Sequence, residues 1–180
     1  MRRHQPALLC GLLAPFLLSA ASLDDQARGA VAKAIPLLQS TSAAFTKVQD
    51  CFSCHHHGLV MMVLASARQH GLPVNETAAR EVTAKVFSGG LENLASIDRT
   101  VQANYIIDPA ISDGYALIAA DAAGVRPSLT TAIVAARTAR WQLPDGHWTT
   151  QDERPPQSNS PFACTAVAAR AVRDWLPDER

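Results

Sequence analysis

The sequence predicts an all-α protein built from stacked helical hairpins. Aromatic residues make up 6% of the 180 residues, charged residues make up 18%, and alanine is frequent throughout. Alternating runs of β-branched residues are nearly absent, so intrinsic propensity favours helices over strands. A unit of helix, turn and helix also recurs, because Gly71 precedes the helix cap Asn75 by the same interval that separates Gly124 from Ser128. Such a repeat predicts hairpins that stack side by side.

The chain opens with the pattern of a secretory signal peptide. A pair of arginines precedes an apolar stretch over residues 6–18, and small residues follow it. We therefore assign residues 1–21 to a signal peptide, residues 22–50 to a helical lead-in and residues 51–180 to the repeat domain. We expect a periplasmic or secreted protein with no membrane span after cleavage. The 16 basic and 16 acidic residues of the full chain give no reason to expect nucleic acid as a partner.

The first two helices are predicted from apolar residues at helical spacing. The lead-in should form a helix over about residues 23–47, which Pro36 is expected to end or kink. Its predicted buried face is Ala30, Ala34, Leu37 and Leu38. A second helix should run over about residues 54–70 and end at Gly71. Its predicted buried stripe is Leu59, Met62, Val63, Ser66 and Ala67.

Five further helices are predicted between glycine and proline breaks. They are expected at about residues 76–88, 91–103, 113–123, 129–142 and 161–176. The polar, proline-rich stretch over residues 143–160 should form a long loop. The predicted inward positions are Ala79, Val82 and Val86 in the first of these helices and Leu129, Ile133 and Ala136 in the fourth.

The segment Gln142-Leu143-Pro144-Asp145-Gly146-His147-Trp148 combines Gln, Gly and Trp at the end of a predicted helix. It resembles the repeat motif of the squalene-hopene cyclase and protein prenyltransferase superfamily, over roughly residues 54–175. The resemblance implies an α/α toroid, here open or partial because the chain holds too few hairpins to close one. A glutamine at a helix end can pair exposed backbone groups while a tryptophan covers it. The Asp-rich acid motif and the zinc ligands of those enzymes have no match, so an isoprenoid cyclase-like activity does not carry over and no enzyme is expected.

Cys51-Phe52-Ser53-Cys54-His55 is the attachment signature of a c-type haem. Cys51 and Cys54 would form the two thioethers, and His55 would be the axial iron ligand. No methionine follows Met62, and residues of the helix that begins at His55 stay on the proximal side of the ring. His147, the remote histidine of the mature chain, is therefore the candidate for the second axial ligand.

Two other chemistries fit the same cluster. Cys51 and Cys54 with His56 and His57 could bind zinc, because two thiolates and two imidazoles make a tetrahedral site. Cys51 and Cys54 could instead form a disulfide in an oxidising compartment. Cys164 is interpreted as a buried small hydrophobe, and Met61 and Met62 as core residues.

Besides an isoprenoid cyclase-like enzyme, which the missing acid motif disfavours, these observations lead to two functional hypotheses. The first is an exported haem c-binding helical repeat protein that transfers electrons or senses redox state, with a redox partner protein or another copy of itself as partner. The second is a non-enzymatic helical scaffold that binds a partner and holds structural zinc or a disulfide at its Cys and His cluster.

Overall fold

A computed structural model describes residues 22–49, 52–87, 109–150 and 160–176. These residues form helices and no strand, which confirms the all-α prediction for this part of the chain. The elements are α1 (Leu23–Val48), the π-helix η1 (Cys54–Gly58), α2 (Leu59–Gln69), α3 (Glu76–Phe87), α5 (Pro109–Ala122), α6 (Leu129–Arg140) and α7 (Pro161–Trp175). The predicted signal peptide and the helix predicted at 91–103 lie outside the described residues.

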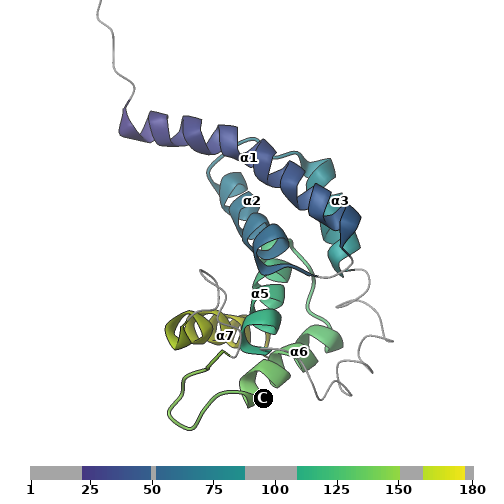
Figure 1. Cartoon of the computed structure of the whole chain (residues 1–180), viewed down its shortest axis with the longest axis vertical. Helices are drawn as coiled ribbons and strands as arrows, with labels where there is room; N and C mark the ends of the chain where they lie inside the picture. Colours follow the sequence, from purple (N-terminus) through teal and green to yellow (C-terminus); the bar gives the residue numbers. More distant parts are fainter. Residues whose placement is uncertain (1–21, 50–51, 88–108, 151–159, 177–180) are drawn as a thin grey trace, which may run out of the picture.

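The helices form two groups that meet at α5 (Figure 1). In the upper group, α1 packs against α3, α2 and η1; in the lower group, α5, α6 and α7 pack against one another. Helix α5 also contacts α2 and η1, so it joins the groups. One apolar cluster runs through both, with Met61 from α2, Phe87 from α3, Leu117 from α5, Val134 from α6 and Trp175 from α7. No described helix combines the length and apolarity needed to cross a bilayer.

Two helix–turn–helix units have the same turn. Gly71 and Gly124 end α2 and α5 with φ angles of 68° and 74°, a left-handed conformation that glycine adopts without strain. After each glycine, the next backbone N–H donates back to a carbonyl in the final turn: Leu72 to Ala67 and Val125 to Ala120. The predicted helix–turn–helix units are thus present at α2–α3 and α5–α6, and in the second unit the two helices pack against each other.

The buried face of α1 differs from the apolar face predicted for it. Its buried residues are Ile35, Gln39, Ser42 and Thr46, whereas Leu37 is 67% exposed. Two of the polar members are bonded to other elements. Gln39 accepts from the backbone N–H of Asn75 at 3.1 Å and donates to its carbonyl at 2.9 Å, and Thr46 Oγ1 lies 2.9 Å from Nε2 of His57. Because these bonds offset the cost of burial, hydrophobic spacing alone did not predict the polar residues of this face. Of the predicted residues, Leu38 packs against the core, while Ala30 and Ala34 are exposed. Pro36 lies inside α1 without ending it, and the ribbon bends near its middle (Figure 1).

Two other predicted stripes are displaced by about one residue. In α2 the buried residues are Val60, Met61, Leu64 and Ala67, and the predicted Ser66 is exposed. In α6 they are Thr130, Thr131, Val134, Ala135 and Thr138, and the predicted Leu129 and Ala136 are exposed. Three of these buried residues are threonines, and Thr138 donates its hydroxyl to the carbonyl of Val134, so the spacing of aliphatic residues did not predict this face. In α3 the predicted Val82 is buried and Val86 is half-buried.

Helix α5 begins at Pro109, earlier than predicted, because proline at the first helical position needs no N–H partner. It lies very close to α7: a Cβ atom on Gly114 would sit 2.6 Å from Cγ1 of Val167. One residue earlier, Asp113 accepts two hydrogen bonds from Arg137 on α6, at 2.7 and 2.8 Å. Burial raises the pKa of Asp113, and the bonds and charge of Arg137 oppose that shift.

Candidate functional site

The π-helix η1 holds the histidines of the Cys and His motif. Ser53 precedes it in an extended conformation, and its Oγ accepts the backbone N–H of His56 at 3.2 Å. The Ser53 carbonyl accepts the N–H groups of both His57 and Gly58, at 2.9 and 3.1 Å, which widens the turn. A Cβ on Gly58 would lie 3.2 Å from Cζ of Phe52 and 3.7 Å from the carbonyl oxygen of Tyr115. Glycine thus permits the close contact between η1 and α5.

His57 is part of the protein core. Its side chain is 1% exposed, and both ring nitrogens are hydrogen-bonded. The Ser53 N–H donates to Nδ1 at 3.1 Å, so Nε2 carries the proton and donates to Thr46 Oγ1 at 2.9 Å. Thr46 in turn donates to the Ser42 carbonyl at 2.7 Å. Burial lowers the pKa of His57, and the neighbouring imidazoles of His56 and His55 lower it further.

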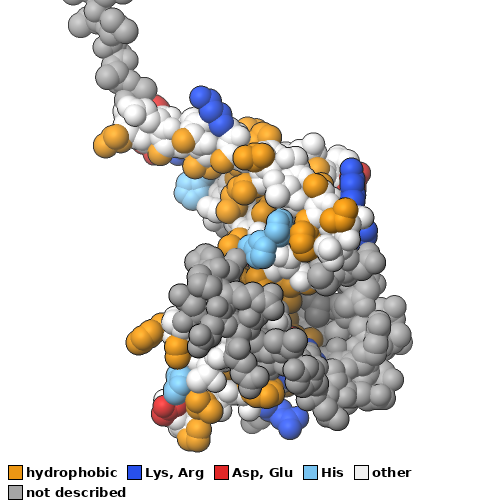
Figure 2. Space-filling model, viewed as in Figure 1, with side chains coloured by type: hydrophobic (Ala, Val, Ile, Leu, Met, Phe, Trp, Pro, Cys, Tyr) orange, Lys and Arg blue, Asp and Glu red, His pale blue; other side chains and the backbone are white. Residues whose placement is uncertain are grey.

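His56 makes fewer hydrogen bonds with the described residues than His57, and His55 makes fewer still. His56 stacks on Phe45 of α1, with ring centroids 4.3 Å apart and planes 10° from parallel, and its Nδ1 lies 3.3 Å from Ser53 Oγ. Burial lowers the pKa of His56, as does the nearby His55. His55 is exposed, contacts only the ring of His56 among aromatic side chains, and makes no ring hydrogen bond within the described chain. Figure 2 shows histidine side chains at the surface below α1.

Cys54 borders a second apolar cluster. This cluster contains Ala110, Ile111, Trp148, Cys164 and Ala168, and Cys54, Tyr115, Val167 and Val172 pack against it. Burial raises the pKa of Tyr115, and the nearby Cys54 and Cys164 raise it further. Cys164 is fully buried, as expected of a small hydrophobe. The proximity of Tyr115 and Cys164 to Cys54 could not be predicted from the sequence, because these residues come from two other helices, α5 and α7.

The loop after α6 carries the Gln, Gly and Trp motif, but two of its roles differ from those expected. Trp148 is 3% exposed, and its Nε1 donates to the Thr138 carbonyl at 2.8 Å, so the tryptophan pairs the helix end. Gln142 instead closes the loop by donating to the Gly146 carbonyl at 2.9 Å. Thr165 on α7 accepts the Trp148 backbone N–H at 3.0 Å, which fixes the loop to the next helix.

His147 lies in this loop, directly before Trp148. Its Nδ1 is 2.6 Å from Asp145 Oδ1, so the carboxylate accepts the Nδ1 proton and leaves Nε2 able to accept or bind a metal. Such a carboxylate partner is typical of histidines that bind metals, because it fixes the tautomer and the ring orientation. Since Trp148 belongs to the cluster against which Cys54 packs, the His147 loop and η1 border the same apolar region.

The structure therefore brings together part of the predicted site. Cys51 lies outside the described residues. Among the residues that are described, no group of three or more His, Cys, Asp or Glu side chains is arranged to hold a metal ion. The zinc alternative would require His57 to give up two buried hydrogen bonds. His57 as a core residue was missed because its partner Thr46 lies on the unexpected polar face of α1.

No protein-family model matches the chain, and neither the curated proteins nor the solved structures compared with it give a significant match. The resemblance to the squalene-hopene cyclase and prenyltransferase superfamily stays a hypothesis that rests on the Gln142 to Trp148 segment.

Proposed function

We propose that this chain binds one haem c and uses it to transfer electrons or to sense redox state. The observation that carries the proposal is the difference between the three consecutive histidines. His57 is held by two buried hydrogen bonds and His56 stacks on Phe45, while His55 is exposed with both ring nitrogens outside any described hydrogen bond. The histidine that the attachment signature requires is thus the one the fold does not use.

The residues around the motif suit this cofactor. Cys54 is half-buried at the edge of an apolar cluster, which provides a surface for the apolar edge of a porphyrin. Cys51 and Cys54 would hold the group covalently, and His55 would bind the iron. When bound, haem supplies a one-electron iron couple whose potential depends on the axial ligands and on burial. Asp145 would orient His147 as the second axial ligand through the Nδ1 hydrogen bond.

Expression with the leader in a bacterium that matures cytochromes c tests the proposal. The expected product gains the mass of one haem and keeps a haem spectrum after denaturation. The Cys54→Ala variant should lose one thioether, and His55→Ala should alter the iron spectrum or abolish attachment. His70→Ala, at the exposed end of α2, is the matched control and should behave as wild type.

A colourless product of unmodified mass would refute haem binding. Metal analysis and thiol counting of that product would then distinguish zinc from a Cys51–Cys54 disulfide, which are the two forms of the scaffold hypothesis. If haem is attached, the His147→Ala variant tests the second ligand: a low-spin spectrum identical to wild type would exclude His147. Asp145→Asn should weaken the same ligation less strongly.

A further inference from the structure

A cavity of about 590 Å³ lies between α1, α2, α3 and the end of α5. This volume falls in the range of about 300–1,000 Å³ that small-molecule sites occupy. No described residue of the Cys and His motif lines the cavity. It is therefore a separate candidate site from the one proposed for haem.

Most of the cavity wall is apolar. The apolar lining comes from α2, α3 and the end of α5 and includes Val60, Met61, Leu64, Ala79 and Val82. On the α1 wall, Gln39 is occupied by its two bonds to the Asn75 backbone, while the buried Ser42 Oγ has no hydrogen-bond partner within the described residues. The wall thus favours a largely apolar molecule.

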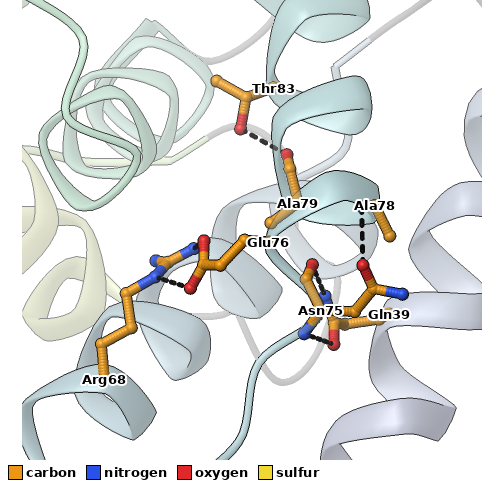
Figure 3. A network of polar contacts seen from close by, with 7 residues as sticks. All are labelled: Gln39, Arg68, Asn75, Glu76, Ala78, Ala79 and Thr83. Atoms are coloured by element: carbon orange, nitrogen blue, oxygen red, sulfur yellow. Dashed lines mark hydrogen bonds and ion pairs between the residues drawn. The ribbon is translucent and has the colours of Figure 1, made fainter.

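Charged side chains are grouped on one part of the lining. Arg68 on α2 donates from Nε and Nη2 to the two Glu76 oxygens on α3, at 2.8 and 2.9 Å (Figure 3). Arg80, one turn further along α3, also lines the cavity. The hydrogen bonds from Arg68 lower the pKa of Glu76, and the charge of Arg80 lowers it further.

These three side chains leave an excess of one positive charge. Arg68 Nη1 makes no hydrogen bond in the described part of the chain, so two of its N–H donors stay available beside the cavity. A cation would be repelled by this excess charge. A carboxylate would gain charge-assisted hydrogen bonds from the guanidinium, which are stronger than bonds between neutral groups.

We infer that the cavity binds an apolar carboxylic acid of medium chain length. The aliphatic chain lies against the alanine, valine and leucine side chains of α2 and α3. The carboxylate is held by Arg68 and by the field of Arg80, and it competes with Glu76 for the same guanidinium.

Calorimetric titration of the purified protein with octanoate, decanoate and dodecanoate tests this inference, at concentrations below micelle formation. Each added pair of methylene groups should lower Kd by about tenfold until the cavity is full. The neutral alcohol 1-decanol should bind at least about tenfold more weakly than decanoate, since it lacks the charge-assisted bonds. No saturable heat with any acid, or equal affinity for the alcohol, would overturn the inference.

Two substitutions with opposite expected effects locate the site. Arg68→Gln should weaken decanoate binding about tenfold, because it removes a charge-assisted bond. Glu76→Gln should tighten binding several-fold, because it removes the competing carboxylate. Arg173→Gln is the control, since Arg173 is an exposed arginine paired with Asp174 on α7 and should leave Kd unchanged. If both cavity variants bind as wild type, the acid binds elsewhere and the assignment fails.

Filling the cavity provides an independent test. Ala79→Leu should reduce decanoate binding by adding bulk to the lining, while Ala166→Leu, at an exposed position on α7, should not. Circular dichroism confirms that each variant is folded. The Arg68 and Glu76 variants decide the question if Ala79→Leu destabilises the fold.

Discussion

Replacing His57 with phenylalanine tests the structural role assigned to this histidine. The change keeps an aromatic ring of similar shape but removes both nitrogens. The Ser53 N–H would lose its acceptor at a buried position, which costs about 1–3 kcal/mol, and the bond to Thr46 would be lost at about 1 kcal/mol. Thr46 would keep its own bond to the Ser42 carbonyl. The expected loss in the free energy of unfolding is therefore about 2–4 kcal/mol.

Urea unfolding followed by circular dichroism at pH 7.5 measures this loss. His70→Phe is the matched control, because the side chain of His70 is exposed, and it should change stability by less than about 0.5 kcal/mol. A double-mutant cycle with Thr46→Val should show coupling of at least about 0.5 kcal/mol between His57 and Thr46. A loss for His57→Phe no larger than that of the control would refute the assigned role.

Other predictions concern pH, a helix end and a buried ion pair. The pKa of His57 is lower in the folded protein than its unfolded value of about 6.5, so the unfolded state binds more protons. Stability should therefore fall as pH drops below about 6.5. The urea midpoints at pH 7.5 and pH 5.5 should differ more in wild type than in His57→Phe. Trp148→Phe should cost about 1 kcal/mol by thermal unfolding, because the indole bond to the Thr138 carbonyl is lost while that carbonyl keeps the Trp141 N–H at 3.2 Å. Asp113→Leu should cost about 3 kcal/mol by urea unfolding because Arg137 loses this carboxylate, and adding Arg137→Met should recover part of it.

The sequence predicted the helical elements and their turns better than their buried faces. Turns were predictable because glycine after a helix and a polar cap before the next one act locally, as at Gly71 and Ser128. Buried faces were not, because several buried positions are polar residues whose partners are remote in sequence. The burial of Gln39 depends on its two hydrogen bonds to the backbone of Asn75, and no local pattern contains that information.

The candidate site was also predictable only in its local features. The order Cys54, His55 is a local signal, so the motif could be recognised without a fold. The distinction between adjacent histidines depends on α1, which supplies Thr46 to His57 and Phe45 to His56. The carboxylate partner of His147 lies two residues away, at Asp145, and could have been read from the sequence as a candidate orienting group.

The two hairpins show how far the motif departs from a regular repeat. Leu64 and Leu117 precede the turn glycines of α2 and α5 by the same interval, and both are buried. The equivalence fails at the start of these helices, where α5 is regular α-helix from Pro109 while the first hairpin begins with the π-helix η1. From Pro109 onward, α5 packs against its neighbours as a regular α-helix. Single π-helical turns within helices are frequent at functional sites. The departure coincides with the Cys and His motif, which favours a function for its exposed member, His55, beyond holding the hairpin together.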